Sequence, residues 1–140
     1  MVAERSGRPL VLVVDDYQDA REMYAESLRA SGFIVAEAGT GDEAVAKARE
    51  LLPHAIVMDL SLPGMDGWTA TRLLKLDPRT RDIPVVALTG NARADASAAA
   101  REAGCDAFLV KPCLPDDMIA AVRRVLALIG ERVGTPDSNT

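Results

Sequence analysis

Cysteine, histidine and aromatic residues are all scarce in this chain of 140 residues. The two cysteines, Cys105 and Cys113, have neither the density of a disulfide framework nor the close spacing of a metal-binding pair, so we expect both to be reduced. The single histidine, His54, has no partner ligand nearby in the sequence. We interpret all three residues as structural, which argues against a disulfide-stabilised secreted scaffold and against a zinc site.

Long apolar runs and an excess of positive charge are also missing. No apolar stretch approaches the roughly 18 residues that a membrane-spanning helix requires, and the early acid Glu4 with the short apolar run after it is unlike a secretory signal. The net charge of −5 argues against broad binding to the phosphate backbone of nucleic acids. We therefore expect a cytoplasmic protein that contacts neither membrane nor DNA directly.

What the chain does contain is a regular alternation of strand and helix patterns. Continuous Val, Leu and Ile runs are typical of buried parallel strands, and apolar positions three or four apart are typical of helices packed against them. The expected strands cover residues 10–14, 33–35, 55–58, 83–88 and 106–110, and the expected helices cover 18–31, 42–52, 68–76, 92–103 and 115–130. This pattern predicts an α/β fold with a doubly wound, five-stranded parallel sheet of order 2-1-3-4-5 and helices on both faces, a flavodoxin-like arrangement.

Residues at the expected boundaries agree with this division. Thr40, followed three residues later by Glu43, forms a capping box in which two side chains satisfy unpaired amides at a helix start. Glycine favours the left-handed conformation that ends many helices, and three expected helices are followed by glycine, at Gly32, Gly104 and Gly130. We expect one domain over residues 9–130, with disordered segments at 1–8 and 131–140.

Four of the apolar runs lead directly into polar side chains. These are the pair Asp15 and Asp16 after the first run, and then Asp59, Thr89 and Lys111 after three later runs. Because the carboxyl ends of parallel strands meet at one edge of a sheet, we expect three carboxylates, a hydroxyl and an ammonium to share a pocket. Clustered carboxylates repel one another, and a hard divalent cation such as Mg²⁺ relieves that repulsion. A lysine can reach a phosphoryl group, and an aspartate is a competent nucleophile for one.

The segments around these residues resemble the receiver domain of bacterial two-component response regulators. The matching stretches are residues 11–16, 57–67, 83–90 and 104–112, and the resemblance covers residues 9–130. It implies that Asp59 accepts a phosphoryl group from a histidine kinase or a histidine phosphotransfer protein. It also implies that the chain is not a turnover enzyme, beyond its own phosphotransfer and autodephosphorylation.

The resemblance further implies how a metal ion is held. Asp16, Asp59 and the backbone carbonyl of Ser61 would bind Mg²⁺ directly, and Asp15 would act mainly through water. Ser61 and Asn91 occupy the positions that resemble the family's tuners of dephosphorylation. Because neither side chain is a carboxylate that could orient water, we expect a phosphorylated form of moderate to long life.

A switch is implied as well. Thr89 and Lys111 would contact the phosphoryl oxygens, and Phe108 would be an aromatic switch that turns inward when Thr89 moves toward the phosphate. The peptide bond between Lys111 and Pro112 resembles a cis bond of the family.

The expected output of the switch is a contact with a downstream protein. The roughly ten residues after Ile129 are too few for a DNA-binding domain of typical size, so the fourth helix, fifth strand and fifth helix are expected to bind a protein target. A receiver excised from a hybrid kinase or from a larger regulator would have the same sequence features, and this alternative stays open.

Three other functions fit parts of the sequence. The segment 39–44 has the outline of a dinucleotide fingerprint, but Asp42 and Glu43 would repel a pyrophosphate at that helix start. A Mg²⁺-dependent phosphatase with an aspartyl nucleophile would need a second acid as its general acid, and Ser61 stands in that place. A flavin-binding module would need a hydroxyl- and glycine-rich first loop, whereas residues 15–19 are mainly acidic.

Overall fold

The computed structural model describes residues 7–90 and 94–138, and in the second range the side chains of residues 98–129. The expected disorder of residues 1–6 and the tuning role of Asn91 therefore fall outside the described residues. Strands and helices alternate along the described chain as β1 (Leu10–Val14), α1 (Gln18–Ala30), β2 (Ile34–Ala38), α2 (Gly41–Leu51), β3 (Ala55–Asp59), α3 (Gly67–Leu76), β4 (Val85–Thr89), α4 (Ala94–Ala103), β5 (Ala107–Val110) and α5 (Pro115–Ser138).

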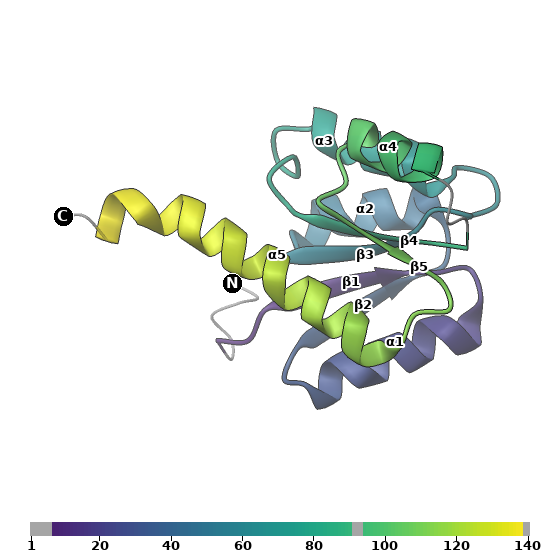
Figure 1. The fold of residues 1–140 in the computed structure, drawn as a ribbon, viewed down its shortest axis with the longest axis horizontal. Helices are drawn as coiled ribbons and strands as arrows, with labels where there is room; N and C mark the ends of the chain where they lie inside the picture. The colour runs from purple at the N-terminus through teal and green to yellow at the C-terminus, as the bar shows by residue number, and fades with distance from the viewer. Residues whose placement is uncertain (1–6, 91–93, 139–140) are drawn as a thin grey trace.

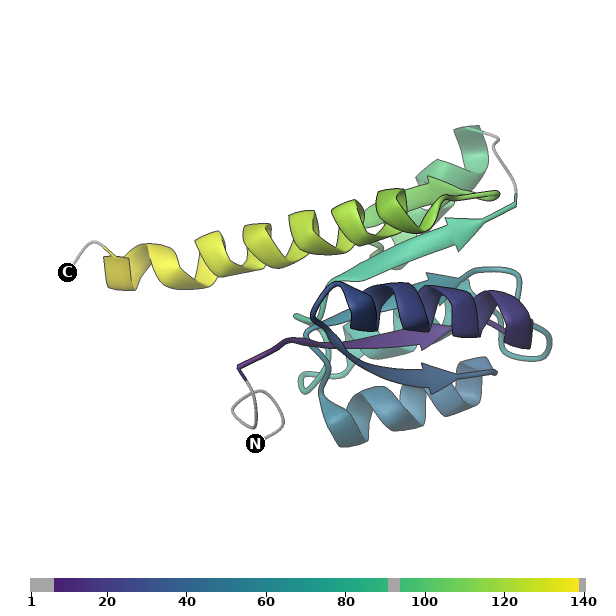
Figure 2. The same cartoon turned by 90° about the horizontal axis from the view of Figure 1, so that it is seen from below.

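The strands form one sheet in the order β2-β1-β3-β4-β5, and every neighbouring pair is parallel. Helices α1 and α5 cover one face, and α2, α3 and α4 cover the other, as Figure 1 shows and the view in Figure 2 confirms. The predicted doubly wound α/β fold and its strand order are therefore confirmed. In this topology the chain reverses its winding direction between β1 and β3, so ligands are expected at the carboxyl ends of these strands.

Both faces of the sheet are buried, which explains why the central strands are continuously apolar. Along β1, Leu12 and Val14 point into the cluster under α2, α3 and α4. Val11 and Val13 point into the opposite cluster, which is filled by α1 and α5. Packing of these two apolar layers holds each strand in place, and so it sets the position of any polar group that follows the strand.

The predicted helix boundaries are largely confirmed. The Thr40 hydroxyl accepts a hydrogen bond from the Glu43 N–H at 3.1 Å. The Glu43 carboxylate accepts from the N–H of Gly39, one residue before the N-cap, at 2.8 Å. Gly32 and Gly104 have φ angles of +98° and +106°, which suits the left-handed turns expected there.

Strand β2 differs from its predicted range. It begins at Ile34 and continues through Ala36 and Glu37 to Ala38, although the polar Glu37 was expected to lie beyond its end. The reason is the ladder with β1, which pairs Leu10 with Ile34 and extends without interruption to the pair Val14 and Ala38. Backbone pairing with a buried strand decides the length of this edge strand, whatever the polarity of its side chains.

Helix α5 differs most from its predicted range. It was expected to end near residue 130, yet it runs to Ser138 and includes Gly130 within its length. Residues 131–138, which were expected to belong to a disordered tail, continue the helix beyond the sheet (Figures 1 and 2), and the expectation for residues 139–140 falls outside the described residues. Gly130 costs the helix only about 1 kcal/mol relative to alanine, and an established helix gains a hydrogen bond with each added residue. The extension also contains Gly134 and Pro136, whose intrinsic preferences oppose a helix and do not explain its length. Among the described helices, none has both the length and the apolar character needed to cross a bilayer.

Candidate functional site

The carboxyl ends of the strands bring the three predicted acids together. Carboxylate oxygens of Asp15, Asp16 and Asp59 all lie within 4.8 Å of one another. Asp15 and Asp59 are buried, with 1% and 4% of their surface exposed, whereas Asp16 is open to solvent. We call these three residues the acidic triad. It has two carboxylates anchored in the fold and one at the surface.

Lys111 lies against the two buried members of the acidic triad. Its Nζ is 3.1 Å from Oδ2 of Asp15 and 3.2 Å from Oδ2 of Asp59. Its backbone N–H donates to the carbonyl oxygen of Thr89 at 2.6 Å, so the residue continues the pairing of β4 with β5. The sheet thus places one ammonium between two carboxylates, one that follows β1 and one that ends β3.

The two buried carboxylates are held in the same way. Oδ1 of Asp15 accepts the N–H of Tyr17 at 2.9 Å, and Oδ1 of Asp59 accepts the N–H of Ser61 at 2.9 Å. Each aspartate therefore caps its own turn two residues on, as Asx-turns do. This leaves Oδ2 of each carboxylate to face Lys111. The orientation of Asp59 is fixed before any ligand arrives.

The charges of this pocket are not balanced. Burial raises the pKa of Asp59, and the charge of Asp15 adds to this, although the Ser61 N–H and the Lys111 ammonium act in the opposite direction. Burial alone would lower the pKa of Lys111, but its hydrogen bond to Asp15 and the charges of Asp59 and Asp15 outweigh it and raise this pKa. A further cation would relieve the cost of ionising Asp59. Oxygen donors from three carboxylates fit a hard divalent cation.

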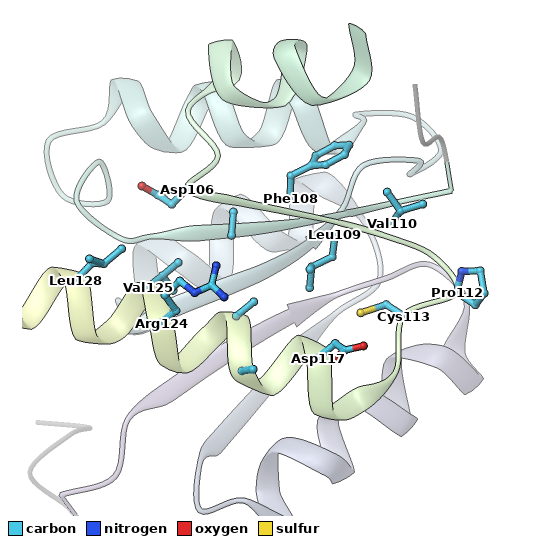
Figure 3. A pocket seen from close by; sticks show the side chains of 13 residues that line it. Asp106, Phe108, Leu109, Val110, Pro112, Cys113, Asp117, Arg124, Val125 and Leu128 are labelled. Carbon is cyan, nitrogen blue, oxygen red and sulfur yellow. The ribbon is translucent and has the colours of Figure 1, made fainter. Parts of the chain in front are cut away.

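Thr89 and Phe108 lie on the neighbouring strands β4 and β5. Thr89 ends β4, is buried, and pairs in register with Val110. Phe108 pairs in register with Ala87 and packs against the cluster under α2, α3 and α4. Figure 3 shows its ring on the side of the sheet away from α5.

The remaining predicted residues lie in the loops. The Ser61 side chain is exposed, and its backbone N–H is the group that contacts Asp59. Asn91 is outside the described residues. The peptide bond between Lys111 and Pro112 is cis, as predicted.

A model of the response regulator receiver domain matches residues 11–123 of this chain. The chain belongs to this family. The receiver is 39% identical over 132 residues to the transcriptional regulatory protein PrrA of Mycobacterium tuberculosis, a match that covers 94% of the receiver and 54% of PrrA. It thus spans about half the length of that regulator.

Two solved structures show the same fold. The receiver matches the Vibrio cholerae chemotaxis protein CheY4 with a TM-score of 0.81 and 28% identity, over 84% of this chain and 98% of CheY4. It matches the receiver domain of a sensor histidine kinase from Pseudomonas aeruginosa with a TM-score of 0.79 and 29% identity, over 86% of this chain and 98% of that one. The Pseudomonas structure contains a magnesium ion coordinated in its active site cleft.

Sequence reasoning missed one residue that shapes the receiver's pocket. A Cβ atom placed on Gly67 would lie 2.4 Å from the backbone carbonyl oxygen of Asp59 and 2.7 Å from Cα of Leu60. The first turn of α3 therefore lies directly against the chain that carries Asp59. Only glycine allows this approach. The signal in the sequence was weak, because a glycine next to the N-cap Asp66 also fits an ordinary helix start.

We expect Gly67→Ala to destabilise the receiver by about 1–3 kcal/mol, because backbone on both sides must shift to admit the methyl group. Urea unfolding measures the change. Gly90→Ala is the matched control, since a Cβ there meets no atom of the described residues within 4 Å, and a change within about 0.5 kcal/mol is expected. Equal stability of Gly67→Ala and the native chain would show that the close approach of α3 is unimportant.

Proposed function

We propose that this receiver accepts a phosphoryl group on Asp59 from a phosphohistidine and that the modification switches a protein-binding surface. The observation that carries the proposal is the position of Asp59. It is a buried carboxylate at a strand end, oriented by the Ser61 N–H and placed 3.2 Å from the Lys111 ammonium. An anchored carboxylate beside a fixed positive charge is suited to attack on phosphorus, because phosphoryl transfer depends mainly on positioning and charge neutralisation.

In the proposed step an oxygen of Asp59 forms a bond to phosphorus as the bond between phosphorus and the donor's imidazole nitrogen breaks. The electron pair of the broken bond stays on that nitrogen. The donor ring, protonated beforehand on its other nitrogen, therefore leaves as a neutral imidazole. Lys111 faces the charge on the transferred oxygens, and the Thr89 hydroxyl contacts the same group. No side chain is needed as a general acid, so the chain acts as a phosphoacceptor.

Mg²⁺ is the proposed cofactor. Asp16, Asp59 and the Ser61 carbonyl would hold it directly, with Asp15 acting through water. When bound, the ion supplies positive charge against the acidic triad and the phosphoryl oxygens. The fit of three carboxylates around one point supports this assignment, as does the magnesium in the related Pseudomonas receiver.

The proposed partners are a histidine kinase or a histidine phosphotransfer protein upstream and a protein target downstream. Phosphorylation would draw Thr89 toward the phosphoryl group and let Phe108 turn inward, which changes the surface of α4, β5 and α5. The relatives include a receiver from a sensor kinase and a transcriptional regulator about twice as long as this chain. A receiver that acts within such a larger protein is therefore the second candidate, and direct contact with DNA is not expected of the receiver itself.

Local packing disfavours dinucleotide binding at the segment 39–44. A Cβ on Gly41 would lie 2.4 Å from the Met65 carbonyl oxygen, so this glycine serves close packing against the β3–α3 loop. The N–H of Gly39 is already bound by the Glu43 carboxylate. A pyrophosphate would meet an acid and a backbone carbonyl at the place where it needs free amides.

Incubation with acetyl phosphate and Mg²⁺ tests the proposed function. We expect intact-protein mass spectrometry to show one phosphoryl group per chain, and the label to persist for minutes after the donor is removed, because Ser61 offers no carboxylate to orient water. Continuous release of inorganic phosphate without a labelled chain would indicate a phosphatase instead. Loss of the label within a few seconds would contradict the expected lifetime.

A further inference from the structure

Tyr24 has an unexplained polar contact. It lies on α1, is 3% exposed, and packs in the apolar cluster shared by α1 and α5. Its hydroxyl donates to the backbone carbonyl of Cys113 at 3.1 Å. Cys113 follows Lys111 and Pro112 in the loop that joins β5 to α5, and Figure 3 shows this loop at the sheet edge before the first turn of α5.

The contact fixes the loop that carries Lys111. On one side of this residue, its own N–H donates to the Thr89 carbonyl. On the other side, two residues later, the Cys113 carbonyl is held by Tyr24. Between these two anchors the Lys111 side chain extends to the Oδ2 atoms of Asp15 and Asp59. The first anchor comes from the sheet, and the second comes from α1.

The same helix also holds the opposite wall of the pocket. Arg21, three residues before Tyr24, donates from Nη1 to the backbone carbonyl of Asp15 at 3.0 Å. Its Nε pairs with the Glu37 carboxylate at 3.1 Å, so the arginine is itself held in place. Residues three apart lie on the same side of a helix. One face of α1 therefore binds the backbone of both loops that flank the acidic triad.

We propose that Tyr24 is a positioning residue for phosphoryl transfer, acting through Lys111. By holding the Cys113 carbonyl it sets the place of the loop, and so the reach of the ammonium toward the phosphoryl oxygens. The ring alone accounts for the apolar packing, whereas the buried hydroxyl requires a polar partner. The inference rests on the proposed phosphorylation of Asp59, because positioning of Lys111 matters only if a phosphoryl group arrives there.

Tyr24→Phe removes the hydroxyl and keeps the ring. We expect labelling by acetyl phosphate with Mg²⁺ to slow about fivefold, the change that corresponds to one net hydrogen bond of about 1 kcal/mol. The decisive comparison is made in a Lys111→Met background. There Tyr24→Phe should cause no further slowing, because the ammonium through which Tyr24 is proposed to act is absent. A purely structural role would give the same fold-change in both backgrounds.

Thr80→Val is the matched control. The Thr80 hydroxyl is also buried and donates to a backbone carbonyl, that of Leu74 at 2.7 Å, in the connection between α3 and β4. Loss of the Thr80 hydroxyl should lower the free energy of unfolding, measured with urea, about as much as Tyr24→Phe does. It should leave the labelling rate unchanged. If Tyr24→Phe labels at the native rate, or slows equally in both backgrounds, the positioning role is wrong while the proposed function stands. A native chain that takes no label would overturn both.

Discussion

Replacement of Lys111 by methionine is expected to slow the labelling of Asp59 by about 10²-fold. Methionine keeps much of the length and apolar character of the lysine stem but removes the charge that lies 3.2 Å from Asp59. Loss of one preorganised group that faces developing charge in a transition state costs about 10²–10³-fold in rate. The lower end is expected because Mg²⁺ would still neutralise part of the phosphoryl charge. The initial rate of labelling by acetyl phosphate measures the effect.

Lys75→Met is the matched control for this substitution. The Lys75 side chain is exposed to a similar degree, 21% against 27% for Lys111, and it also pairs with an aspartate, Asp106, at 3.4 Å. It lies at the other end of the sheet, where its Nζ donates to the Ile83 carbonyl. Labelling of this variant should proceed at the native rate. If both methionine variants slow equally, a general loss of stability would account for the result, and the role of Lys111 would be wrong.

Stability in the absence of divalent cations is expected to fall as the pH rises through the titration of Asp59. Its raised pKa means that the folded chain binds this proton more tightly than the unfolded chain. Protonated Asp59 therefore adds to the free energy of unfolding below the ordinary pKa of an aspartate. This contribution is lost as the pH rises past the raised pKa. Asp59→Asn removes this cost, so at neutral pH the variant should unfold at a higher urea concentration than the native chain.

The difference between native chain and Asp59→Asn isolates this effect from other titrating groups. Urea unfolding in EDTA, from about pH 4 to about pH 8, should show the difference growing with pH. Mg²⁺ should then stabilise the native chain by about 2.7 kcal/mol at a free concentration one hundred times its Kd. The variant, with one carboxylate fewer, should gain less. A native chain that is insensitive to Mg²⁺ would contradict the proposed metal site.

The pocket was predictable because its residues lie directly at the ends of strands. Once the five apolar runs are taken as parallel strands, the order of the sheet and its switch point bring Asp15, Asp59 and Lys111 to one edge. The structure places them within contact distance of one another. Predicting this pocket needed only the apolar runs, the sheet order expected for them and the polar residue that follows each run.

The boundaries were harder because they depend on backbone pairing more than on side-chain type. Glu37 is polar and still belongs to β2, since its neighbours continue the ladder with β1. Gly130 suggested a helix end, yet α5 continues past it. At Glu37 and Gly130 a local preference of about 1 kcal/mol or less is outweighed by hydrogen bonds that the element gains by continuing. Gly134 and Pro136 oppose the rest of α5 more strongly, so local preferences do not explain its full length.

Contacts between distant parts of the chain could not be derived from the sequence. Tyr24 and Cys113 are 89 positions apart, and the tyrosine fits the apolar stripe of α1 whether or not its hydroxyl has a partner. The close approach of Gly67 to the Asp59 carbonyl likewise depends on how α3 packs against the sheet. Both contacts support residues that the sequence did predict, and both were invisible in the local pattern.

The most direct test of the account compares phosphorylation of the native chain and of Asp59→Asn. Both proteins are incubated with acetyl phosphate and Mg²⁺, and phosphoryl incorporation is measured by intact-protein mass spectrometry. We expect one phosphoryl group on the native chain and none on the folded variant, because the amide lacks the nucleophilic oxygen. Equal labelling of the two proteins would contradict the assignment of Asp59 as the phosphoacceptor.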